Sequence, residues 1–232
     1  MTLANTAKLS SEKPTISFNW TVVGSLFFLM AIPAIPAMFF ITAVALGPSV
    51  IGELTAYVSA AHFEKPAALF VHGGSGVLFF LSMPFQFSPK LRASHLNWHK
   101  MSGRIAVVSG YVMAISGVWM HNVLTPESQG GRYFSLIVMS IAMCLTFSIA
   151  LWHIINKRVS AHQKWMARAV AVTLAAVTPL FVDILILLVF GSFNGVFDML
   201  VDLHHNYGRL LAIVINLSVV EFWFNRKKQT GQ

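Results

Sequence analysis

The sequence of 232 residues is 56% hydrophobic and only 10% charged, with a mean hydropathy of +0.69, which excludes a soluble domain of that length. Its formal net charge of +8 does not indicate nucleic-acid binding, because the basic residues are scattered between apolar segments, as in membrane proteins. The single cysteine, Cys144, lies in an apolar run, so a disulfide framework and a cysteine-based metal site are excluded as well. We therefore expect an all-α polytopic integral membrane protein, with the lipid bilayer as its surroundings.

The polar residues 1–16 lack apolar periodicity, and we expect them to form a disordered cytoplasmic tail. Residues 17–226 are predicted to form a single transmembrane domain with six spans, and short connections favour antiparallel packing of neighbours in a bundle. The segment 47–65 mixes charged and apolar positions, which predicts an amphipathic helix at the membrane interface. The six expected spans, each near the roughly 20 residues that cross a hydrocarbon core, are 17–46, 66–87, 102–121, 133–155, 166–190 and 207–225.

The orientation follows from the lysines and arginines. With six spans, the tails and the second and fourth loops share one side of the membrane and carry thirteen of the sixteen basic residues. The other side has only Lys65, Arg132 and Arg209. Because basic residues accumulate in cytoplasmic loops, we expect both termini in the cytoplasm, in the inner (plasma) membrane of a bacterium.

Nine histidines are an unusual number for membrane segments, and two of them begin the third and fifth spans from the same side. These are His99 and His162, followed by Arg104 and Arg168. One interpretation is a haem b whose iron is bound by the two imidazoles and whose propionates pair with the two guanidinium groups. The alternative is that the cations only follow the positive-inside rule while the histidines lie at helix starts.

His72 lies about 9 Å inside its helix by helical rise and is surrounded by Gly73, Gly74 and Gly76. It is predicted either to bind a second haem iron, with His121 as a further candidate, or to form a hydrogen bond between closely packed helices. Both histidines belong to the side away from the cytoplasm.

One face of the third span carries Gly103, Gly110 and Gly117, because steps of seven residues nearly close two helical turns. Small residues in membrane helices admit either a neighbouring helix or, here, the edge of a porphyrin. The sequence leaves both possibilities open.

Other polar groups within spans are Gln86, Asp183 and Asn216, which would line an internal polar site or form hydrogen bonds between helices. Asp183 follows Pro179, and a carboxylate inside a membrane is a candidate for proton relay. Asp198, Asp202 and His205 are spaced for one helix face, which favours a solvated surface over a divalent metal site.

Several of these residues together resemble a family of predicted membrane proteins, domain of unknown function 2306, over roughly residues 66–225. The most specific element is His-x-x-Trp-Met-x-Arg at residues 162–168, in which Gln163 departs from the basic residue common in the family. The resemblance implies a multi-helix membrane fold without supplying an activity. The residues it marks as a functional set are His72, Gln86, Arg92, His99, Arg104, His162 and Arg168.

Our leading hypothesis is a membrane protein that binds haem b and transfers electrons, with a quinone or a redox partner protein as the other reactant; if it is an enzyme, it is a membrane oxidoreductase. The first alternative is a proton-coupled transporter or small-ligand-binding protein lined by His72, Gln86, Asp183 and Asn216. The second is an accessory subunit that binds a membrane complex through its glycine faces. No hydrolase, phosphate-loop or zinc-protease motif is present in the sequence.

Overall fold

A computed structural model describes residues 18–229, and the expected tail at 1–16 lies outside this range. The described chain is helical, without strands, which confirms the all-α class. Five helices are long and apolar enough to cross a membrane, and α8 with α9 adds a sixth span if this pair, bent by 50°, is counted as one. The protein is therefore a polytopic membrane protein.

The first half of the chain contains α1 (Trp20–Leu46), α4 (Pro66–Ser82) and α6 (Leu96–Leu124). Asn19 caps α1 by accepting a hydrogen bond from the Val22 N–H, and α1 ends at Gly47, whose φ of +83° suits glycine. The expected interfacial helix is instead divided into three short pieces, because Gly52 also has a positive φ and Val58 is extended. These pieces are α2 (Pro48–Ile51), the 3-10 helix η1 (Gly52–Tyr57) and α3 (Ala60–Glu64).

Between α4 and α6 the chain turns through η2 (Pro84–Phe87) and α5 (Pro89–Ser94), each beginning with a proline. Proline suits the first turn of a helix, where its missing N–H leaves no hydrogen bond unmade. The third expected span starts six residues earlier than predicted, because α6 continues to Leu96 in its polar first turns.

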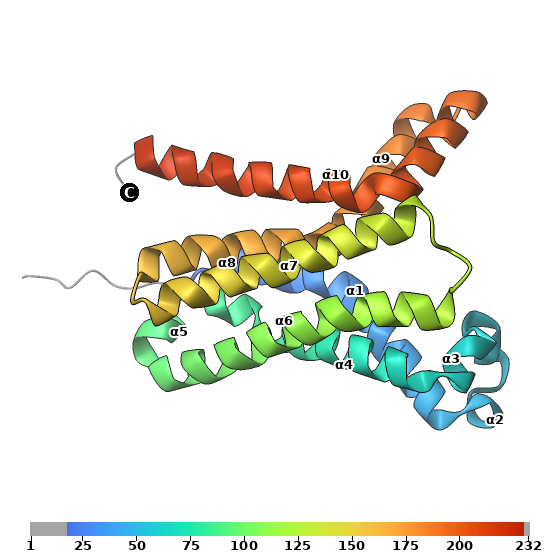
Figure 1. Ribbon diagram of the computed structural model, residues 1–232, viewed down its shortest axis with the longest axis horizontal. Helices are drawn as coiled ribbons and strands as arrows, with labels where there is room; N and C mark the ends of the chain where they lie inside the picture. Colours follow the sequence, from blue (N-terminus) through green and yellow to red (C-terminus); the bar gives the residue numbers. More distant parts are fainter. Residues whose placement is uncertain (1–17, 230–232) are drawn as a thin grey trace, which may run out of the picture.

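The second half contains α7 (Gly131–Ile155), α8 (Val159–Thr173), η3 (Leu174–Ala176), α9 (Thr178–Phe190) and α10 (Asn194–Gln229). The break between α8 and α9 precedes Pro179, which cannot donate to the carbonyl four residues earlier. The last helix is much longer than the expected span 207–225, and its first turns run beside α9 (Figure 1).

Neighbouring helices pack in sequence: α1 on α4, α4 on α6, α6 on α7, and α7 on both α8 and α10 (Figure 1). The core lies between α4, α6, α7 and α8, where Phe79, Met83, Met143 and Phe147 are almost fully buried. Because lipid tails are as apolar as these side chains, close packing, not exclusion of water, has to hold the helices together.

The histidine end is the end where α6 and α8 begin and α7 finishes; the far end is the end where α6 finishes and α7 begins. The described chain begins and ends at the histidine end (Figure 1).

Candidate functional site

His162 lies in the first turn of α8 at the histidine end, half-buried against α7. Its Nδ1 is 2.8 Å from the Ala150 carbonyl oxygen. A carbonyl can only accept, so Nδ1 carries a proton and donates it. In the neutral imidazole Nε2 then has a free lone pair, the state in which histidines bind metals.

His99, in the first turn of α6, lies close enough to His162 and Arg92 for their charges to interact. Its Nδ1 is buried and has no hydrogen-bond partner in the described part of the chain. A buried polar nitrogen without a partner is costly and calls for an explanation by function or by a bound group. His99 and His162, predicted as a pair, thus lie within electrostatic range of one another on different helices, and no hydrogen bond or ring contact joins them in the described residues.

The two arginines predicted to accompany these histidines differ in whether they already have a carboxylate partner. Arg168 donates to both carboxylate oxygens of Glu221 in α10, at 2.6 and 3.1 Å, and its guanidinium lies over the Trp165 ring. Arg104 is exposed and forms no ion pair within residues 18–229. Only Arg104 is therefore free to meet another carboxylate.

The glycine face of α6 is filled by protein side chains. A Cβ at Gly103 would lie 2.9 Å from Gln86 Oε1, one at Gly110 2.8 Å from Phe147, and one at Gly117 3.2 Å from His72. Gln86 is fixed there because its Nε2 donates to the Ser102 hydroxyl at 2.5 Å. Of the two possibilities left open by the sequence, this face therefore admits neighbouring helices.

His72 is held between α4 and α6 by Nδ1, which donates to the Met113 carbonyl at 3.1 Å and lies 3.3 Å from the Ser116 hydroxyl. His121 has another role, since its Nε2 donates to the Ser128 carbonyl at 2.7 Å and its ring stacks on Tyr133. No hydrogen bond or ring contact joins these two histidines in the described structure.

Asp183 and Asn216 lie in the interface between α10 and the bent span, apart from Gln86 and Arg92. Asp183 accepts from His204 Nδ1, and His204 is 7% exposed with a buried, unpartnered Nε2. Asn216 donates to the Ala171 carbonyl and accepts from the Thr178 hydroxyl, both at 3.0 Å. His72 and Gln86 thus bond to α6, whereas Asp183 and Asn216 bond across α10 and the bent span, so these predicted lining residues do not share one site.

The sequence did not predict the pairing of His204 with Asp183 or of Glu221 with Arg168. Gly208, one turn after His204 in α10, leaves room for the His204 ring, because a Cβ there would lie 2.7 Å from Nε2, but this spacing does not indicate Asp183 as the partner. The candidate metal face at Asp198 is not assembled: Asp202 accepts from Asn206, and His205 contacts Arg132. Within residues 18–229, no three His, Cys, Asp or Glu side chains are placed to hold a metal ion.

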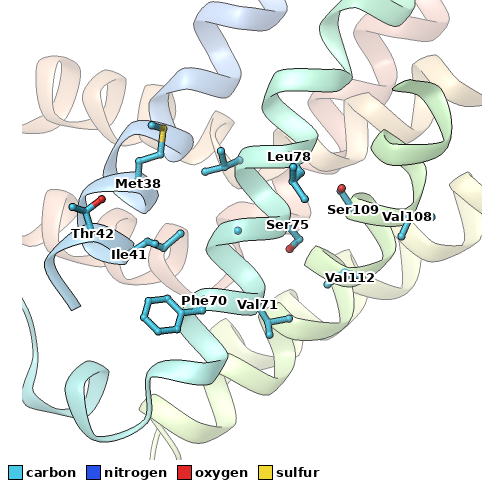
Figure 2. A pocket seen from close by; sticks show the side chains of 12 residues that line it. Met38, Ile41, Thr42, Phe70, Val71, Ser75, Leu78, Val108, Ser109 and Val112 are labelled. Atoms are coloured by element: carbon cyan, nitrogen blue, oxygen red, sulfur yellow. The ribbon is translucent and has the colours of Figure 1, made fainter. Parts of the chain in front are cut away.

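An open apolar groove of about 650 Å³ lies between α1, α4 and α6 (Figure 2). Its walls are side chains such as Met38, Phe70 and Leu78, and three residues add hydroxyl groups: Thr42, Ser75 and Ser109. The Ser75 hydroxyl already donates to the His72 carbonyl. The groove has no titratable side chain and is suited to a lipid chain, not to chemistry.

A family model described as a predicted membrane protein (DUF2306) matches residues 69–224, from α4 to nearly the end of α10. The match includes every candidate site residue and leaves α1 and the short helices after it outside. Neither a curated protein nor a solved structure matches the chain.

Proposed function

The chain belongs to the DUF2306 family of predicted membrane proteins, and from its histidine end we propose that it binds haem b and transfers electrons. The observation that carries this proposal is that His99 of α6 and His162 of α8 lie at the same end of the bundle, close enough for their charges to interact. The Ala150 carbonyl selects the tautomer of a neutral His162 in which Nε2 is the nitrogen with the free lone pair, and the buried Nδ1 of His99 lacks a protein partner among the described residues.

His99 and His162 offer the nitrogen donors that haem iron binds. Two neutral imidazoles are a common ligand pair for haem iron, and a b-type haem held by them supplies a one-electron carrier. The Ala150 carbonyl fixes the tautomer and orientation of His162, as backbone carbonyls do for metal-binding histidines. Arg104 would pair with a propionate, whereas Arg168 is already paired with Glu221.

We propose a single haem site, at the histidine end. His72 and His121, the candidates for a second site, each have a protein partner and do not contact one another in the described structure. The electron donor or acceptor would be a membrane quinone or a redox partner protein. The excess of basic residues favours a cytoplasmic position for the histidine end and both termini, in a bacterial inner membrane.

The test is the reduced-minus-oxidised absorption spectrum of detergent-purified protein expressed with ample haem. We expect a b-type spectrum in the wild type and its loss in His99→Ala and in His162→Ala. His95→Ala is the matched control, because His95 is exposed beside the same helix start and its loss should leave the spectrum unchanged. A colourless wild-type protein, or a spectrum that survives both substitutions, contradicts the proposal.

A proton-coupled transporter is the second candidate, and the Asp183–His204 pair favours it. A buried histidine bonded to a carboxylate inside a membrane can carry a proton between two sides. In this case a pH-sensitive dye enclosed in proteoliposomes should report proton uptake that Asp183→Asn abolishes, and the protein should be colourless. Uptake equal in wild type, Asp183→Asn and empty liposomes rejects this candidate.

A further inference from the structure

Two arginines meet at the far end of the bundle, away from the paired histidines. Arg132 is the second residue of α7, and Arg209 lies in the middle of α10. Arg209 Nη1 is 3.5 Å from the Arg132 carbonyl oxygen, and the two charges are close enough to repel one another. Arg132 Nη1 also donates to His205 Nε2 at 3.0 Å, so that nitrogen is unprotonated and accepts.

Close contact between α7 and α10 holds the two arginines in place. A Cβ at Gly131 would lie 2.9 Å from the Tyr207 ring, so α10 approaches the start of α7 because Gly131 has no side chain. One turn further along α7, the fully buried Ser135 hydroxyl donates to the Asn206 carbonyl at 2.7 Å. These contacts fix the register of α7 against α10 beside the arginines. The packing of the two helices therefore places Arg132 and Arg209 close together.

No carboxylate compensates this charge. Within residues 18–229, no Asp or Glu side chain lies within ion-pairing distance of Arg132 or Arg209. Asp183 accepts from His204 and Asp202 accepts from Asn206, while Glu127, in the loop before α7, forms no ion pair with either arginine in the described residues. A half-buried arginine in a spanning helix beside a second arginine is unfavourable unless an anion joins the pair.

We propose that Arg132 and Arg209 bind the phosphate group of a membrane phospholipid. Two guanidinium groups present planar sets of donors that suit phosphate oxygens, and the N-terminus of the 25-residue α7 adds a favourable dipole beside them. Arg132 lies at the start of the spanning helix α7, the level at which phospholipid headgroups lie, and this position favours a lipid headgroup over free phosphate as the source. The site is independent of the histidine end and stands whether or not haem binds there.

The experiment is native mass spectrometry of detergent-purified protein titrated with dihexanoyl phosphatidylglycerol, with inorganic phosphate as a separate arm. We compare the wild type with the double variant Arg132→Gln/Arg209→Gln. The matched control is Arg158→Gln, which removes one charge at the histidine end, where Arg158 lies over the Trp152 ring. Arg132→Lys/Arg209→Lys keeps the charges but loses the planar donors.

We expect the apparent affinity for phosphatidylglycerol to fall at least about tenfold in the Gln double variant, to fall less in the Lys variant, and to stay unchanged in Arg158→Gln. Inorganic phosphate that competes with the lipid at equal concentration would assign the site to the free anion and overturn the lipid source. Equal lipid affinity in the wild type and the Gln double variant overturns the site itself. If the double variant does not fold, the lipid affinity of Arg132→Gln is measured instead, because Arg132 is exposed and its guanidinium is not part of the core. A lower affinity then supports the site, and an unchanged affinity overturns it.

Discussion

At the scale of single residues, the three glycines of α6 decide how closely its neighbours approach. A Cβ would collide with Gln86 at Gly103 and with Phe147 at Gly110, and at Gly117 it would make a tight contact with His72. Gly74 in α4 is different, since a Cβ there would have no atom within 4 Å. Glycines of similar appearance in the sequence therefore have different energetic roles.

Gly110→Ala is expected to lower the free energy of unfolding by about 1–3 kcal/mol, because its Cβ would lie 2.8 Å from the fully buried Phe147 ring. Gly74→Ala is the matched control and should leave stability unchanged or raise it by about 0.5–1 kcal/mol, since alanine is the better helix former. Thermal unfolding of the detergent-solubilised variants measures both. Equal midpoints for the two variants would contradict the packing seen at Gly110.

At the scale of elements, the break between α8 and α9 is stabilised from outside the bent span. Asn216 of α10 bonds the Ala171 carbonyl and the Thr178 hydroxyl on either side of η3. Arg168 and Glu221 join α8 to α10 nearer the histidine end. The long last helix thus serves as a support for the bent span.

Asn216→Leu should lower the free energy of unfolding by about 1–2 kcal/mol, because it leaves the Ala171 carbonyl without its side-chain donor. We expect faster amide exchange at residues 171–183 in hydrogen–deuterium exchange mass spectrometry. Asn97→Leu, at an exposed position of α6, is the control. If amide exchange becomes faster only around residue 216 and stays unchanged at residues 171–183, Asn216 does not support the break between α8 and α9.

At the scale of the whole molecule, counting the α8–α9 pair as one span gives six crossings and places both ends of the described chain on one side. We expect single cysteines at Ser128 and Lys157, introduced after Cys144→Ser, to react with a membrane-impermeant maleimide from opposite sides. A cysteine near the C-terminus should react from the same side as Lys157 and as one near the N-terminus. Labelling of the two termini from opposite sides would mean that α8 and α9 form a re-entrant loop.

The sequence predicts the fold class and the approximate positions of the long apolar helices, because the length of an apolar run is determined by bilayer thickness, but it does not predict the 50° bend within the fifth expected span. It does not predict the division of residues 47–65 at Gly52 or the length of α10, since the first turns of α10 are stabilised by α9. The proximity of His99 and His162 follows from topology. Pairings that depend on helix rotation, such as Arg168 with Glu221 and Asp183 with His204, require the packed structure.

The filled glycine face of α6 also restricts how this protein can move. Rotation of α6 about its own axis, or sliding along it, would drive Gln86, Phe147 or His72 against helix backbone that now gives them room. Any change of shape would therefore carry α4, α6 and the adjoining part of α7 as one rigid body. The bend before Pro179, where the hydrogen-bond ladder is already interrupted, is the place where the rest of the molecule can hinge against it.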